Sequence, residues 1–178
     1  MRTQRIGGYT LIELLTVVAI ISILALAAPS MGSLVDSNRQ HSHLFELQRL
    51  LQLARSSAIS SGKTITLCGS NDGTQCDDKW SSPTVLIFED KNNNHVLDET
   101  DAVIQRNYLE NSRWYWKGSN RPYLRYRSDG SPMEWGHFTL CPANTTSRDA
   151  NQIILNFVGR PYLKKLPIQN LPASEQCG

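Results

Sequence analysis

A run of twenty residues near the amino terminus constrains this chain more than any other feature. Residues 9–28 read YTLIELLTVVAIISILALAA and contain a single charged side chain, Glu13. A helix of this length rises about 30 Å, the hydrocarbon thickness of a bilayer. Arg2 and Arg5 precede the run, which predicts an amino terminus that stays cytoplasmic. We interpret the run as a membrane helix, with a cleaved secretory signal peptide as the alternative.

The one carboxylate in the apolar run needs an explanation. A charged side chain in hydrocarbon costs about 2.5–3.5 kcal/mol on insertion scales, so Glu13 must lie near the interface or have a cationic partner. Cleavage after Gly8 would supply such a partner, because the new α-amino group of Tyr9 would lie about one helical turn from Glu13. In an assembly, the amine of one subunit could neutralise the carboxylate of its neighbour.

The same residues resemble a processing signal. Gly8-Tyr9-Thr10-Leu11-Ile12-Glu13 and the apolar run behind it are similar to the class III signal of type IV pilins and pseudopilins. Gly8 matches the residue before the cut, and Glu13 matches the glutamate of that family. Tyr9 replaces the usual phenylalanine. The resemblance implies cleavage after Gly8 by prepilin peptidase, N-methylation of Tyr9 and a role for Glu13 in assembly.

The apolar run continues into an amphipathic segment. Pro29 removes a helical hydrogen bond and predicts a bend. Beyond it, apolar residues recur at spacings of three and four, at Leu44, Leu47, Leu51, Ala54 and Ala58. Ser60, Ser61 and Gly62 supply a stop signal. The resemblance implies one long helix, whose first half lies in the membrane or filament core and whose second half packs on a sheet.

Short β-rich runs separated by turn residues occupy the chain from Lys63 onward. The predicted strands are residues 64–68, 84–88, 114–116, 123–126, 138–141 and 152–158. A long helix followed by an antiparallel sheet predicts an α+β fold. The expected parts are a leader (1–8), a transmembrane or filament-core helix (9–28), its amphipathic continuation (29–62) and a periplasmic β-rich globular domain (63–178).

Short segments of the β-rich part resemble the minor pilins of the FimT/FimU kind and the related H-type, GspH-like pseudopilins of type II secretion. They are residues 66–68, 79–81, 85–90, 138–142 and 153–160. Their order along the chain, together with the amino-terminal signal, supports the resemblance, to which residues 106–136 add nothing. It implies a pilin-like fold and a structural role in a filament.

Four cysteines follow the apolar run, at Cys68, Cys76, Cys141 and Cys177. On the outward side of a bacterial inner membrane, the oxidising periplasm favours disulfides. Three pairings are open. We prefer Cys68–Cys76 with Cys141–Cys177, because the first bridge closes a short loop and the second holds the carboxyl terminus. A zinc site is the alternative, but neither CxxC spacing nor a nearby pair of histidines supports it.

Residues 90–101 alternate oxygen-bearing side chains in the manner of a calcium loop. Asp90, Asn92, Asn94, Asp98 and Asp101 fall at loop positions 1, 3, 5, 9 and 12. His95 stands where such a loop needs glycine, and Asp101 replaces a longer, bidentate glutamate. We interpret the segment as a turn between strands and expect no cofactor, with calcium as the alternative.

Two basic clusters suggest DNA as a partner. In the first, Arg121 and Arg125 belong to a stretch without acidic residues that is interleaved with aromatic rings, as a nucleic-acid surface would be. An ordinary sheet, with aromatics on one face and solvated arginines on the other, explains the same pattern. The second cluster contains Arg160, Lys164 and Lys165, with Arg148 as a candidate neighbour.

The second cluster departs from the family pattern that it resembles. DNA-binding minor pilins of the FimT kind have a Gly-Arg-x-Arg element near the carboxyl terminus. Here the element reads Gly159-Arg160-Pro161-Tyr162, so the second arginine is missing. Without residues 1–8 the chain loses Arg2 and Arg5, so its 18 basic residues fall to 16 against 16 acidic ones. Any DNA binding therefore depends on local clusters and not on net charge.

An enzyme is not expected. Gly62-Lys63-Thr64 resembles the end of a P-loop, but Ser57 occupies the place of its first glycine, and the chain has no GxSxG motif. The predicted function is that of a minor pilin, a structural subunit of the tip complex that primes type IV pilus assembly in twitching motility, adhesion or DNA uptake. The alternatives are a DNA-binding minor pilin for natural transformation and an H-type minor pseudopilin of type II secretion.

The predicted partners and location follow from the resemblance. Other minor pilins, the major pilin and prepilin peptidase are the expected protein partners, and DNA is a candidate. The chain is expected to reside in the bacterial inner membrane as a single-pass protein with a periplasmic carboxyl-terminal domain. It would then move into the pilus tip.

Overall fold

The computed structural model describes residues 9–77, 80, 84–109, 114–118, 121–140 and 149–171, without the side chains of residues 26–37, 39–40 and 114–118. One long helix, α1 (Leu11–Ser61), precedes the strands of the chain. The strands are β1 (Ile65–Ser70), β2 (Thr84–Glu89), β3 (Ala102–Tyr108), β4 (Trp114–Gly118), β5 (Tyr123–Tyr126), β6 (Gly136–Leu140), β7 (Asp149–Leu155) and β8 (Pro161–Pro167). A short 3-10 helix, Ile168–Asn170, follows β8. The α+β prediction is confirmed.

Two compact units divide the chain, Met1–Arg39 and Gln40–Gly178, and α1 contributes to both. The helix ends where the stop signal predicts. Gly62 adopts φ +68°, a left-handed conformation that glycine reaches without steric cost, and its N–H donates to the carbonyl of Ala58 at 3.0 Å.

The second half of α1 is buried along the predicted face. Leu44, Leu47, Leu51, Ala54 and Ala58 are each at most 2% exposed. Leu50, which the 3-4 spacing leaves out, is fully buried as well, so the apolar stripe is wider than predicted. The wider stripe reflects a helix that is covered on more than one side.

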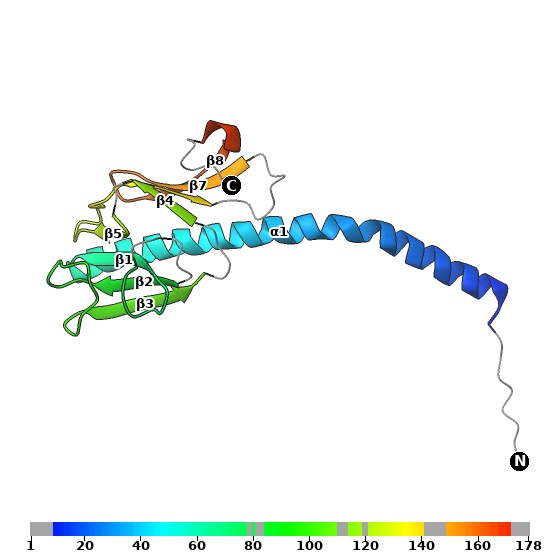
Figure 1. Cartoon of the computed structure of the whole chain (residues 1–178), viewed down its shortest axis with the longest axis horizontal. Helices are drawn as coiled ribbons and strands as arrows, with labels where there is room; N and C mark the ends of the chain where they lie inside the picture. The colour runs from blue at the N-terminus through cyan, green and yellow to red at the C-terminus, as the bar shows by residue number, and fades with distance from the viewer. Residues whose placement is uncertain are drawn as a thin grey trace, which may run out of the picture. The chain divides into compact units, whose positions relative to one another are not determined.

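Two antiparallel sheets flank this half of α1 (Figure 1). Sheet A has the strand order β3-β2-β1-β5, and sheet B has the order β4-β6-β7-β8. One core joins helix and sheets: Leu67 and Leu124 of sheet A and Phe138 and Ile153 of sheet B belong to the same buried cluster as the helix residues. The single sheet that we expected is therefore two, one on each side of the helix.

The outer face of sheet A has a second, smaller core. Cys68, Leu86 and Phe88 point away from the helix and are fully buried. Leu97, from the loop after β2, and Cys76, from the loop after β1, pack on them. Because both of its faces are covered, β1 is buried at every position.

Six predicted strands are present within a few residues of their expected bounds, and two were missed. The prediction of residues 152–158 as one strand is wrong at its end, because β7 stops at Leu155. The side-chain oxygen of Asn156 accepts hydrogen bonds from the N–H groups of Val158 (3.2 Å) and Arg160 (2.9 Å), which turns the chain instead.

Candidate functional site

The first turn of α1 is the segment to which the processing prediction refers. The carbonyl of Thr10 accepts hydrogen bonds from the N–H groups of Glu13 (3.1 Å) and Leu14 (3.2 Å), which begins the helix. Glu13 is exposed in this turn, where a carboxylate interacts favourably with the positive end of the helix dipole. Tyr9 is 86% exposed, and Gly8 lies outside the described residues.

Large apolar side chains stay exposed along the following turns of α1. Their exposed fractions lie between 48% and 78% at Leu11, Ile12, Leu14, Leu15, Val17, Val18, Ile20, Ile21, Ile23 and Leu24. A continuous apolar surface of this size marks a region that other molecules cover. Among the residues that the structure describes, no helix combines the length and the hydropathy that crossing a membrane requires.

The first predicted disulfide is confirmed. Cys68 in β1 and Cys76 in the following loop are bonded, with their Cα atoms 5.5 Å apart. The loop has its own hydrogen bonds as well: the hydroxyl of Ser70 donates to the carbonyl of Gln75 (2.6 Å), and Asp72 accepts from the N–H of Thr74 (2.8 Å). Cys141 and Cys177, the second predicted pair, lie outside the described residues.

In the candidate calcium loop, the carboxylates accept hydrogen bonds from the protein itself. Buried Asp90 accepts from the hydroxyl of Thr66 (3.0 Å) and from the N–H groups of Asn94 and His95 (both 3.1 Å). Asp101 accepts from the N–H groups of Lys91 (3.0 Å) and Asp98 (3.2 Å). These carboxylates are therefore held by donors of the loop and of β1.

Asp98 is bound in the same way, by side chains as well as backbone. It accepts from the amide groups of Asn92 (2.7 Å) and Asn94 (3.1 Å) and from the hydroxyl of Thr100 (2.6 Å). The bond from Thr100 contributes most to lowering the pKa of Asp98 to about 2. Over the described ranges, no group of three or more His, Cys, Asp or Glu side chains is arranged to hold a metal ion. The loop has the geometry of a self-bonded turn.

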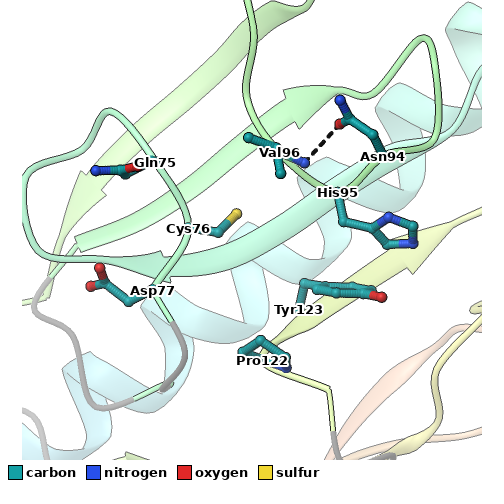
Figure 2. A pocket seen from close by; sticks show the side chains of 8 residues that line it. All are labelled: Gln75, Cys76, Asp77, Asn94, His95, Val96, Pro122 and Tyr123. Atoms are coloured by element: carbon teal, nitrogen blue, oxygen red, sulfur yellow. Dashed lines mark hydrogen bonds between the residues drawn. The ribbon is translucent and has the colours of Figure 1, made fainter.

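A pocket of about 310 Å³ opens between this turn and the disulfide loop (Figure 2). It is lined by Gln75, Cys76, Asp77, Asn94, His95, Val96, Pro122 and Tyr123.

The ring of His95 lies against the ring of Tyr123, with their centroids 4.3 Å apart. The guanidinium carbons of Arg121 and Arg125 lie 5.8 and 5.3 Å from the Tyr123 centroid. The Tyr123 ring therefore already has an imidazole and two guanidinium groups of the chain as neighbours.

The structure divides the first basic cluster between two sheets. The aromatic stretch of this cluster includes residues 114–116, which belong to β4 in sheet B, and Tyr123 and Tyr126, which belong to β5 in sheet A. Tyr126 is fully buried, and this burial raises the pKa of its hydroxyl. Arg125 forms an ion pair of 2.5 Å with Glu134, whose side chain is 3% exposed. Of the two arginines that we singled out, only Arg121 is on the surface.

The second basic cluster is exposed but is not on one face. Arg160 precedes β8, and Lys164 and Lys165 are consecutive residues of that strand, so their side chains point to opposite faces. Lys165 pairs with Asp149 at 3.0 Å. Arg148 lies outside the described residues. Arg160 and Lys164, the other two members that the structure describes, are exposed.

Sequence reasoning missed two exposed aromatic side chains, Trp135 and Phe157, which are 61% and 77% exposed. The predicted strand 152–158 had placed Phe157 in a sheet. Asn156 and Gly159, a turn-forming pair on either side of Phe157 and Val158, are the signal that could have placed these residues in a turn.

The architecture is that of a pilin-like filament subunit: a long helix with an apolar amino-terminal half, followed by an antiparallel β domain closed on its second half. Comparison with known proteins agrees. Residues 45–159, more than half of the chain, match the family model described as type II transport protein GspH, and residues 3–29 match the prokaryotic N-terminal methylation motif. The chain therefore belongs to the GspH family of type IV minor pilins and type II secretion pseudopilins.

Individual relatives come from Pseudomonas aeruginosa. Two fimbrial proteins are each 33% identical over 105 residues, which cover 59% of this chain and 67% of the relative. Two crystal structures of the type IV minor pilin FimU superpose with TM-scores of 0.53 and 0.52 at 18% and 19% identity. The superpositions cover 78% and 79% of this chain and 99% and 96% of FimU, and they establish a shared fold.

Proposed function

We propose that this chain is a minor pilin of a type IV pilus, a structural subunit of the tip complex that primes filament assembly. The observation that supports this most is the contrast along α1. One face of its second half is buried in the core of the β-rich unit (Gln40–Gly178), whereas the large apolar side chains between Leu11 and Leu24 stay exposed and need apolar partners. The fimbrial relatives and the FimU fold favour a pilus over a secretion system.

In this proposal the mechanism is packing and not catalysis. Prepilin peptidase cleaves after Gly8, and Tyr9 becomes the methylated amino terminus. The single-pass protein waits in the inner membrane with its β-rich unit in the periplasm. The apolar helix then leaves the bilayer for the filament core beside other minor pilins and the major pilin. There Glu13 pairs with the α-amino group of a neighbouring subunit, and this pairing sets the axial register of the subunit relative to that neighbour.

The test is the composition of sheared surface filaments from cells that express the chain from its own promoter. Mass spectrometry should find a peptide that begins with methylated Tyr9 in the pilus fraction. Recovery of the chain only with a type II secretion apparatus would overturn the pilus assignment and favour the pseudopilin alternative. Recovery of chains that still begin at Met1 would overturn the processing step.

DNA binding is a second candidate function, because Arg160, just before β8, and Lys164, in the middle of that strand, are exposed cationic groups. We would titrate the chain lacking residues 1–36 with double-stranded DNA at two salt concentrations. A DNA-binding pilin predicts micromolar affinity that weakens steeply with salt and is lost when Arg160, Lys164 and Lys165 are changed to Ala. Arg121→Ala is the matched control, since it removes an exposed cation from the first cluster. Absence of binding at low salt would exclude this candidate.

A further inference from the structure

Two turns of the β-rich unit present apolar side chains next to each other. Trp135 precedes β6, and Phe157 and Val158 lie in the turn between β7 and β8, with exposed fractions of 61%, 77% and 59%. The rings of Trp135 and Phe157 are in contact, with their centroids 5.7 Å apart. These three residues form one apolar patch, called here the turn surface.

The turn that carries Phe157 and Val158 is held rigidly. The side-chain oxygen of Asn156 accepts from the N–H groups of Val158 (3.2 Å) and Arg160 (2.9 Å). The carbonyl of Asn156 accepts from the N–H of Gly159 (2.9 Å). One asparagine therefore fixes the whole turn and directs the two apolar side chains to solvent.

The rest of the fold locks this turn in place. Gly159 adopts φ +79°, and a Cβ atom there would lie 2.2 Å from the carbonyl oxygen of Gly130, so this turn touches the backbone of the turn at residues 127–131. Arg55 of α1 donates to that same carbonyl at 3.0 Å. The fold thus fixes the backbone that presents Phe157 and Val158, which reduces the entropy that docking costs.

Two arginines accompany the patch. Arg160 is exposed immediately after Gly159, and Arg127 is exposed in the connection that leads to Trp135, where it donates to the carbonyl of Pro132 (3.1 Å). Aromatic side chains flanked by arginine are the composition of energetic hot spots in protein interfaces. The positive charges require carboxylates on the facing surface.

The same features disfavour nucleic acid at this patch. The planes of Trp135 and Phe157 are tilted by 48° and their rings are in contact, so they do not form parallel platforms on which successive bases could stack. Val158 has no ring to offer a base. A protein pocket, in contrast, accepts tilted rings and a branched aliphatic side chain equally well.

We propose that the turn surface docks another protein subunit, whose facing surface has an apolar pocket rimmed by carboxylates. The inference rests on the proposed function, since a filament subunit must contact neighbours through its β-rich unit as well as through its helix. Phe157 and Trp135 fill the pocket, and Arg160 pairs with a carboxylate at its rim.

Site-specific photo-crosslinking in the cells that encode the chain tests this docking. The full chain would carry benzoylphenylalanine at Phe157, or at Tyr108 of β3, a 65% exposed aromatic position that serves as the matched control. The Phe157 probe should crosslink to another chain that has an N-terminal methylation motif, and the Tyr108 probe should not give that product. The crosslinked peptide should contain Asp or Glu.

A charge swap then makes the test specific. Arg160→Glu should lower the Phe157 crosslink at least about tenfold, and changing the mapped carboxylate of the partner to Lys should restore it. A product that Arg160→Glu leaves unchanged, equal yields from both probes, or products with lipid or nucleic acid alone would overturn the proposal. The filament content of the same cells separates the two claims. A chain that is in filaments without the Phe157 product refutes the docking site alone, and a chain missing from filaments refutes the proposed function.

Discussion

At the scale of single residues, the contribution of an arginine ion pair depends on how deeply the pair is buried. The sequence predicts Arg125 to be an exposed cation, but in the structure its guanidinium and its backbone N–H both bind Glu134. The backbone N–H donates to the carboxylate at 2.8 Å. Arg49 pairs with Glu46 at 2.8 Å on the surface of α1, where its side chain is 53% exposed. Water screens the second pair and hardly reaches the first, so the two pairs should differ in their effect on stability.

We expect Glu134→Ala to lower the free energy of unfolding by about 3 kcal/mol, because it leaves the charge of Arg125 buried without its partner. Glu46→Ala, the matched control at an exposed pair, should cost less than about 1 kcal/mol. Urea unfolding of the chain lacking residues 1–36 measures both. Equal losses for the two variants would show that the Arg125–Glu134 pair is not a structural element.

The lowered pKa values of two carboxyls predict how stability depends on pH. Hydrogen bonds from Thr74 and Thr100 hold the pKa of Asp72 and of Asp98 at about 2, below the ordinary value of 3.8. The folded protein therefore binds fewer protons than the unfolded chain between these values, so this stabilisation is complete above pH 4 and is lost as the pH falls to 2. Asp98→Asn should flatten the fall in melting temperature between pH 4 and pH 2. An unchanged slope would contradict the account of Asp98.

At the scale of elements, exposure decides what the sequence could predict. The buried half of α1 follows a helical period closely enough to be recognised from its leucines and alanines. β3 and β8 were missed because their sequences are polar, with Gln, Arg and Asn in one case and Pro and Lys in the other, which an edge strand tolerates. The other two edge strands, β4 and β5, were predicted because they are rich in aromatic residues.

The turn at residues 90–101 yields a prediction about calcium. Because Asp90, Asp98 and Asp101 already accept hydrogen bonds from the chain, about 1 mM CaCl₂ should leave the melting temperature unchanged relative to EDTA. Asn92→Ala, which removes one donor to Asp98, should lower the melting temperature equally in both buffers. A calcium-dependent rise of more than about 2 °C would restore the calcium interpretation.

At the scale of the whole molecule, the sequence predicts the fold class and the main elements better than it predicts which side chains meet at the surface. The helix, the α+β class and the Cys68–Cys76 bridge follow from periodicity, turn residues and oxidation chemistry. The pairing of Arg125 with Glu134 depends on how the chain folds back after β5, and the contact between Trp135 and Phe157 depends on the register of β6 and β7, which pairs Gly136 with Leu155. Candidate sites whose side chains are brought together by strand pairing and turns are therefore visible only in the three-dimensional structure.

The central claim is that the chain is a filament subunit and that Glu13 sets its axial register relative to neighbouring subunits. The most direct test compares wild type, Glu13→Ala and Ser22→Ala by cleavage of the leader and by content in sheared pili. Ser22 is the matched control, because its hydroxyl donates to the carbonyl of Val18 in its own helix at 2.7 Å. We predict that all three are cleaved and that only Glu13→Ala falls about tenfold in pilus content, as the loss of one charge pairing would give. Normal incorporation of Glu13→Ala would contradict the account.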